Sequence, residues 1–145
     1  MKYRIEMPAG KKLINVNDKE LRKNYLLRNS LTASLRDTSE QIAREMKIPP
    51  QDKVRVRAFY YYPDNHVRDP GNYAPSVKAM IDGIRLAGVI PNDNDKYLTD
   101  DGILRGYPNV PGGQLVLVVT PYEESILTVI ERLESWGIPY AVIQI

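Results

Sequence analysis

Residues 68–95 carry the side chains with the clearest chemical potential in this sequence. Asp69 precedes a short predicted helix, Asp82 lies on that helix, and Asp93 follows the turn after it. Carboxylates from three separate places in the chain would thus come together, with Lys78 among them. Carboxylate oxygens are preferred ligands of hard cations such as Mg2+, and a cation held in this way activates water against a phosphodiester. The pattern predicts a metal-dependent nuclease.

The spacing on the predicted helix explains why these side chains would face outward. Lys78 and Asp82 are four residues apart, so they point the same way. The apolar residues Val77, Ile81 and Ile84 form another stripe, which must pack on the rest of the protein. Taken alone, the lysine–aspartate pair would be an ordinary solvated helix face. The acids before, on and after the helix together favour a metal-binding catalytic site.

Length and composition limit the alternatives. A chain of 145 residues is expected to form one domain, residues 1–145. Because there is no cysteine, disulfides and thiolate metal sites are excluded, and the absence fits a reducing cytoplasm. A single histidine, His66, excludes a multi-histidine zinc site within one chain, and we interpret it as an exposed bystander in a loop. No apolar run approaches membrane-spanning length.

Hydrophobic periodicity predicts an α+β fold, a mixed sheet with helices packed on it. Along the chain we expect a strand at 2–7, a helix at 30–46 capped by Ser30 and a strand at 53–62. A helix with Pro75 in its first turn should follow and end just before Gly88. Further on we expect turns with at most one short strand in 96–113, a strand at 115–119, a helix at 122–136, and a strand at 141–145. In the strand at 53–62, Val54, Val56 and Ala58 would face the core while Arg55 and Arg57 face outward.

Charge alone does not identify a nucleic-acid partner, because the net charge is only +2. Affinity for DNA would have to come from local basic patches. Segment 11–29 is one candidate, with solvated loop and phosphate-binding segment as equal alternatives; its basic residues are Lys11, Lys12, Lys19, Arg22, Lys23 and Arg28. The tyrosines at 60–62 have the chemistry to stack on bases, although their strand spacing favours core packing on one face of a sheet.

A longer pattern in the same region resembles the core of the RusA family of Holliday junction resolvases, which occur in phages and prophages. The residues that carry the resemblance are Arg68-Asp69-Pro70-Gly71-Asn72, then Lys78, Asp82-Gly83-Ile84, Ala87-Gly88-Val89 and Asn92-Asp93. The similarity is strong over 68–95 and looser over the rest of the first four-fifths of the chain. Residues 121–145 look like an addition to the compact family core.

The resemblance implies a cytoplasmic homodimer in a bacterial host that cuts two strands of a four-way DNA junction symmetrically, using Mg2+, with Mn2+ able to substitute. Asp69 and Asp93 would be the principal metal ligands, and Asp82 a third ligand or the group that orients a metal-bound water. Lys78 would neutralise the charge of the scissile phosphate. Further ligands could come from Asn72, Asn92 and Asp95. The DNA backbone would be held by Lys11, Lys12, Lys19, Arg22, Lys23, Arg55, Arg57 and Arg68.

Two departures from the family pattern remove negative charge from the implied site. Gly71 stands where better-known members have a second loop aspartate, and Asn92 stands where they have the first of two paired acids. We therefore expect Asp82 or Asp95 to supply the missing carboxylate. Two other functions stay open: a junction-binding protein that has lost catalysis through Gly71, and a general nuclease for branched or flapped DNA.

Overall fold

A mixed sheet of four strands forms the centre of the computed structural model. The structure describes residues 2–122 and 126–137. The sheet has the order β1-β4-β2-β3, and its strands are β1 (Tyr3–Glu6), β2 (Val54–Tyr61), β3 (Leu98–Gly106) and β4 (Gln114–Pro121). β4 pairs antiparallel with both β1 and β2, whereas β3 pairs parallel with β2.

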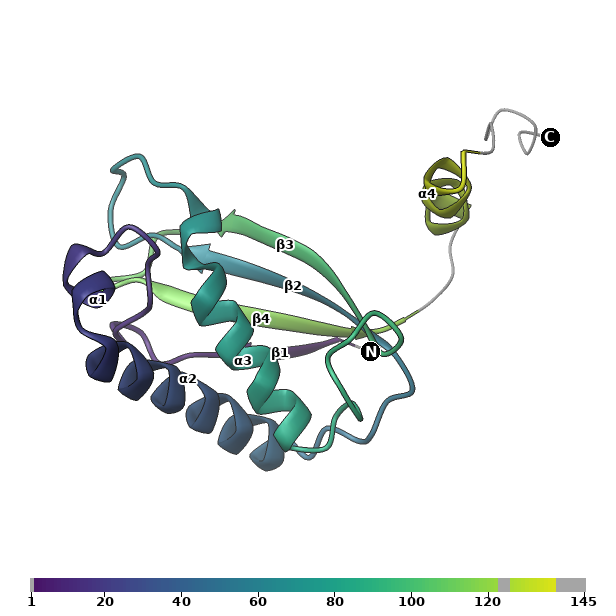
Figure 1. Ribbon diagram of the computed structural model, residues 1–145, viewed down its shortest axis with the longest axis horizontal. Helices are drawn as coiled ribbons and strands as arrows, with labels where there is room; N and C mark the ends of the chain where they lie inside the picture. Colours follow the sequence, from purple (N-terminus) through teal and green to yellow (C-terminus); the bar gives the residue numbers. More distant parts are fainter. Residues whose placement is uncertain (1, 123–125, 138–145) are drawn as a thin grey trace.

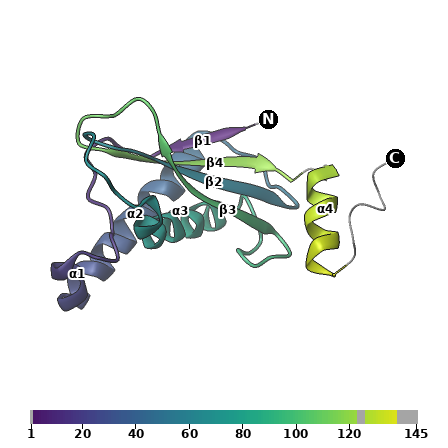
Figure 2. The same ribbon diagram turned by 90° about the horizontal axis from the view of Figure 1, so that it is seen from above.

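Two long helices cover one face of this sheet (Figures 1 and 2). The helical elements are α1 (Lys19–Lys23), α2 (Tyr25–Glu45), the 3-10 turn η1 (Pro70–Tyr73), α3 (Ala74–Leu86) and α4 (Ile126–Ser135). α2 and α3 form the covering layer, and α4 lies beyond the end of the sheet. The predicted α+β class is therefore confirmed. None of the described helices combines the length and apolar composition needed to cross a bilayer.

The alternation predicted for the second strand is also confirmed. Val54, Val56 and Ala58 are buried between β2 and the helical layer. Arg55 and Arg57 alternate with them and therefore point to the opposite face of the sheet. This face carries no helix in the described part of the chain (Figure 2).

The second helix begins earlier than the sequence predicted. We expected a start at Ser30, but α2 begins at Tyr25, where the Asn24 side chain accepts a hydrogen bond from the backbone N–H of Leu27 at 3.0 Å. The short α1 precedes it and buries Leu21. An Asn cap can start a helix without an apolar stripe nearby, so the periodicity of the later residues located the helix but not its first turns.

The segment after α3 was predicted wrongly as mostly turns. It contains β3, a nine-residue strand that pairs with β2. The turns were predicted from the four glycines and two prolines of this segment. One of these glycines, Gly102, instead lies in an irregularity of the pairing, where Asp100 Oδ1 accepts the Gly102 N–H at 2.8 Å and Gly102 has φ +87°. Such a bulge bends a strand without ending it.

The predicted C-terminal helix is confirmed over Ile126–Ser135, whereas Tyr122, its predicted first residue, is not helical. α4 ends at Ser135, and Gly137 adopts a left-handed φ of 75° just beyond, as expected for a glycine past a helix end. The strand predicted at 141–145 lies outside the described residues.

Close packing of α3 against α2 determines which way α3 faces. A Cβ on Gly83 would lie 2.5 Å from the Arg36 carbonyl oxygen and 2.7 Å from the Ser39 Cβ. At the same contact, Ser39 Oγ donates a buried hydrogen bond to the Met80 carbonyl oxygen at 2.8 Å. With this side and its apolar stripe buried, the polar side chains of α3, including Lys78, are left outside.

We predict that Gly83→Ala lowers the free energy of unfolding by about 1–3 kcal/mol, the usual cost of overpacking. In an unobstructed helix the same change would stabilise the protein by roughly 0.5–1 kcal/mol, so the sign tests the contact. Urea unfolding followed by circular dichroism measures it, with Gln41→Ala on the exposed side of α2 as control. A stabilised Gly83→Ala variant would contradict the packing described above.

Candidate functional site

Lys78 lies between two carboxylates that come from different elements. Its Nζ is 3.4 Å from Asp82 Oδ1, one turn further along α3, and donates a hydrogen bond to Asp93 Oδ2 in the loop after the helix. The prediction that Lys78 and Asp82 share a face is thus confirmed. The turn after α3, with Gly88 at φ 84°, returns the chain so that Asp93 meets the same lysine. The structure brings together three of the four residues predicted to be catalytic.

The charges of this cluster reinforce one another. The hydrogen bond to Asp93 is the main cause that raises the pKa of Lys78, with the charges of both carboxylates adding to it. The same bond is the main cause that lowers the pKa of Asp93. At neutral pH Lys78 is therefore a cation and Asp93 an anion, which suits Lys78 for charge neutralisation and excludes it as a base in this arrangement.

Asp69 lies at the start of the helical unit that carries Lys78. Its Oδ1 accepts the Gly71 N–H at 2.9 Å and caps η1, and its backbone oxygen accepts the Asn72 N–H at 3.1 Å. η1 leads directly into α3. Within residues 2–122 and 126–137, no three acidic or histidine side chains gather closely enough to hold a metal ion. A metal site drawn from Asp69, Asp82 and Asp93 together therefore stays a prediction.

A cavity of about 370 Å³ lies between η1, α3 and β3. Gly71 and Lys78 line it from η1 and α3, and Asp100 lines it from β3. Asp100 was not among the residues predicted from the sequence, because its segment was interpreted as turns. The run Asp100-Asp101-Gly102 was the available signal, since acids before a glycine at a strand bulge often accept backbone N–H groups.

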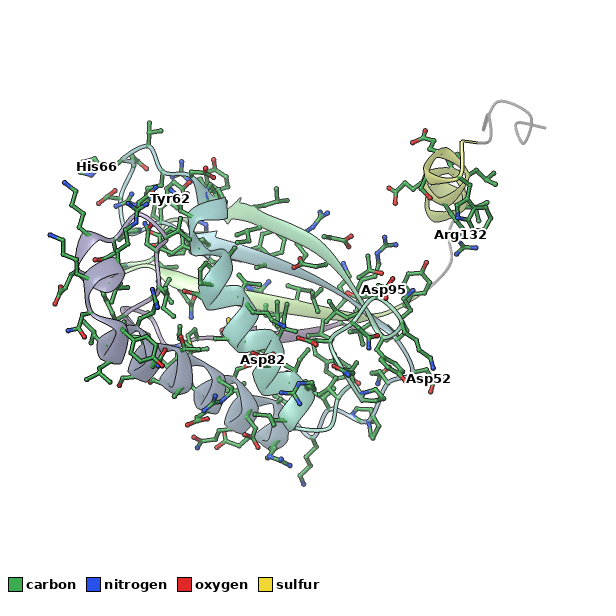
Figure 3. The ribbon with its side chains drawn as sticks, in the orientation of Figure 1. Asp52, Tyr62, His66, Asp82, Asp95 and Arg132 are labelled. Atoms are coloured by element: carbon green, nitrogen blue, oxygen red, sulfur yellow. The ribbon has the colours of Figure 1, made fainter. Side chains whose placement is uncertain are left out.

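The remaining candidate ligands differ in their positions. Asn92 Oδ1 accepts the N–H of Asp93 at 2.8 Å and so helps to orient the residue that meets Lys78. Asp95 is exposed and lies well away from Asp82, towards the end of the molecule where Asp52 lies (Figure 3). Of the two acids proposed to replace the missing carboxylate, Asp82 is the one that the structure places with Asp93.

The basic N-terminal segment is attached to the same helical unit. The Val16 N–H donates to the Asn72 carbonyl oxygen at 2.9 Å. Two buried bonds add to this: the Ile14 N–H donates to Ser76 Oγ at 2.7 Å, and that hydroxyl donates back to the Ile14 carbonyl oxygen at 3.0 Å. These bonds place the segment beside the Asp69 loop, which sequence spacing did not reveal.

Several cations of this segment already have protein partners. Lys12 pairs with Asp18 at 3.2 Å, and Lys11 donates to Ser34 Oγ at 2.7 Å. Arg22 donates to the Val16 carbonyl oxygen at 2.9 Å. On α1, Lys19 and Lys23 are exposed. The segment is a folded element with a basic surface rather than a free loop.

Of the other predicted DNA contacts, Arg55 and Arg57 do not form one surface with it, whereas Arg68 lies next to the Asp69 loop. Arg55 and Arg57 lie on the sheet face away from α2 and α3, and Arg55 bonds Asp101 at 3.1 Å. Arg68 bonds Asp64 at 2.5 Å, close to the Asp69 loop, and this bond is the main cause that lowers the pKa of Asp64 to about 2. His66 has a side chain 84% exposed, as expected for a bystander (Figure 3).

Comparison with known proteins adds little to this geometry. No family model and no curated protein matches the chain. One similar solved structure is the periplasmic domain of Helicobacter pylori MotB, with a TM-score of 0.42 and 11% sequence identity over 94% of this chain and 84% of that one. A likeness of this degree carries no argument about function, which has to come from the site itself.

We predict that Asp93→Asn lowers the pKa of Lys78, because the hydrogen bond to the ionised carboxylate is the largest cause of its upward shift. A pH titration of the lysine side-chain NMR signals measures the change. Asp82→Asn is the matched comparison and should lower the pKa less, since the hydrogen bond to Asp93 outranks both the charge and the hydrogen bond of Asp82. An equal or larger effect of Asp82→Asn would contradict the order of contacts described for Lys78.

Proposed function

We propose that this protein is a Mg2+-dependent endodeoxyribonuclease that resolves four-way DNA junctions. The observation that carries the proposal is the ion-paired cluster of Lys78, Asp82 and Asp93, of which Lys78 also lines a cavity between η1, α3 and β3. The resemblance of residues 68–95 to the RusA family supplies the reaction and the substrate. The basic N-terminal segment beside Asn72 supports an anionic partner at this end of the protein.

The donor set fits the proposed cation. Two carboxylates, Asp82 and Asp93, converge on one cation, the ammonium of Lys78. Mg2+ is usually held by one or two carboxylates with waters and substrate phosphates completing its shell, so three protein acids are not required. Asp93 and Asp82 would hold it. Asp69 would have to approach from its loop, because no three acids of the described residues gather around one point. Mg2+, for which Mn2+ could substitute, supplies a metal-bound water of lowered pKa as nucleophile.

The protein residues have separate roles in this proposal. Lys78, which its neighbours keep protonated, stabilises negative charge on the phosphodiester as the strand is cut. Asn92 orients Asp93 through its backbone N–H. Asp69 caps η1 and so holds its loop in place at the N-terminal end of α3. Each role depends on the position of α3, so the site is built on a rigid element.

The proposed partners follow from the reaction. The described part of the chain carries one such cluster, and symmetric cutting of two strands requires two, so we propose a homodimer. Its substrate would be branched DNA in the cytoplasm of a bacterial cell, from a phage or prophage gene. The two-carboxylate cluster also suits the alternative function, a junction-binding protein with weakened catalysis. A general branched-DNA nuclease would differ from a four-way-junction resolvase only in the DNA structures that it cuts.

The decisive experiment is cleavage of a synthetic four-way junction beside a linear duplex of matched sequence, with and without Mg2+. We predict junction-specific, Mg2+-dependent cleavage by the wild type. Asp69→Asn and Asp93→Asn should each abolish it while leaving junction binding intact or tighter, because each removes a metal ligand and a negative charge that repels DNA. Binding is measured by gel shift in EDTA.

Gln41→Ala on the far side of α2 serves as the unaffected control. Wild-type binding without cleavage would select the junction-binding alternative, and equal cleavage of flaps or forks would select the general nuclease. Full activity in Asp69→Asn would remove that residue from the mechanism and restrict the site to the Lys78 cluster.

Gly71→Asp tests whether the site is already complete. A Cβ at residue 71 would lie 3.2 Å from Asp69 Oδ1, so the new carboxylate would adjoin the existing one. Because Asp82 already accompanies Asp93, we predict little gain in cleavage, or a loss from repulsion of the phosphate. Cleavage rates across a Mg2+ titration measure it. A large gain would show that Gly71 cripples the natural site.

A further inference from the structure

A ladder of tyrosine and arginine side chains crosses the end of the sheet next to the Asp69 loop. The Tyr60 ring lies 4.4 Å from the Tyr73 ring and 5.4 Å from the Tyr62 ring, between centroids. The guanidinium of Arg105 then lies 4.3 Å from the centroid of Tyr62 and 4.6 Å from that of Tyr107. The ladder therefore runs from η1 to the loop that follows β3.

The middle of this ladder is buried, whereas its Tyr107 end is exposed. Tyr60 and Tyr62 are buried, at 6% and 4% exposure, so the base stacking considered for the tyrosine run is not available to these two rings. Tyr107 is 70% exposed. Arg105 covers one face of its ring, which leaves the other face to solvent. The ladder thus ends in one open aromatic face.

Hydrogen bonds fix the position of Arg105 beneath the Tyr107 ring. Arg105 Nη2 donates to Asn109 Oδ1 at 2.9 Å, and Asn109 donates in turn to Asn65 Oδ1 at 2.7 Å. The Nε of Arg105 is buried without a hydrogen-bond partner in the described part of the chain. Arg105 therefore keeps its guanidinium next to both rings while one of its N–H groups has no hydrogen-bond partner among the described residues.

The ladder is also tied to the candidate nuclease loop. Tyr62 Oη donates to the carbonyl oxygen of Arg68, the residue before Asp69, at 3.0 Å. The Arg68 guanidinium lies 5.3 Å from the centroid of Tyr62. Tyr62 therefore contacts Arg68, next to the Asp69 loop, and Arg105, next to Tyr107. These contacts connect Tyr107 with the Asp69 loop.

We propose that the open face of Tyr107 is a stacking platform for an unpaired base of single-stranded DNA. Every base presents a π-face, and base–aromatic stacking tolerates any sequence. Arg105 and Arg68 beside the rings favour a polyanion, although Asp64 offsets Arg68. This inference rests on the proposed function for its partner, because strand exchange points expose bases that can leave the duplex.

The test uses a labelled thymidine oligonucleotide of about 12 nucleotides, within the site sizes of single-strand binders, and an abasic strand of equal length. Fluorescence anisotropy in EDTA measures both affinities without cleavage. We expect wild type to prefer the thymidine strand, and Tyr107→Ala to lose about tenfold of that affinity, the scale of one stacked base. Affinity for the abasic strand should not change, because no phosphate contact is removed.

Two variants sharpen the result. Tyr107→Phe keeps the ring and should bind like wild type. Tyr25→Ala removes another exposed tyrosine, with Arg28 5.9 Å from its ring centroid, and should leave the preference unchanged. Equal loss for both strands in Tyr107→Ala, or no loss for either, would overturn the platform. If the protein prefers the thymidine strand in a Tyr107-dependent way but cuts no junction, the proposed nuclease function would be wrong and the stacking platform would stand.

Discussion

The approach of α3 to the backbone of α2 is the constraint on which the rest of the structure depends. Gly83 has no side chain to hold the helices apart, and Ser39 bonds the Met80 carbonyl oxygen at the same point. Because this contact sets the rotation of α3 about its axis, Ile84 is buried and Lys78 is left at the surface. η1 is continuous with α3, so the loop of Asp69 takes its position from the same contact.

Electrostatic balance around Lys78 links stability with the proposed chemistry. A lysine between Asp82 and Asp93 relieves the repulsion that the two carboxylates would otherwise feel. The carboxylate of Asp93 has lone pairs that Lys78 does not engage. In the proposed reaction these lone pairs would bind Mg2+, while the Lys78 ammonium would compensate the charge of the acids and of a phosphate oxygen.

Cationic and aromatic groups gather at the end of the molecule where the Asp69 loop lies. The basic segment meets the loop through Val16 and Asn72, and the tyrosine ladder meets it through Tyr62. Arg55 and Arg57 face the opposite side of the sheet and serve a different surface. A nucleic acid at the candidate site would therefore contact the N-terminal segment and the loops, rather than all the basic residues that sequence inspection grouped.

Local patterns in the sequence determined the elements with strong periodicity and the pair on one helical turn. The alternation of β2, the apolar stripe of α3 and the glycine past its end were all predictable, because each depends on neighbours within a few residues. The start of α2 and the length of β3 were not predictable. The cap of α2 and the bulge of β3 each depend on one side-chain hydrogen bond, which hydrophobic periodicity does not reveal. Only the tertiary structure decided that Asp93 meets Lys78 and that Asp100 lines the same cavity as Lys78. It also decided that Arg105 lies between Tyr62 and Tyr107. These contacts join residues from different elements, and the packing of helices on the sheet, not spacing along the chain, determines which of them lie together.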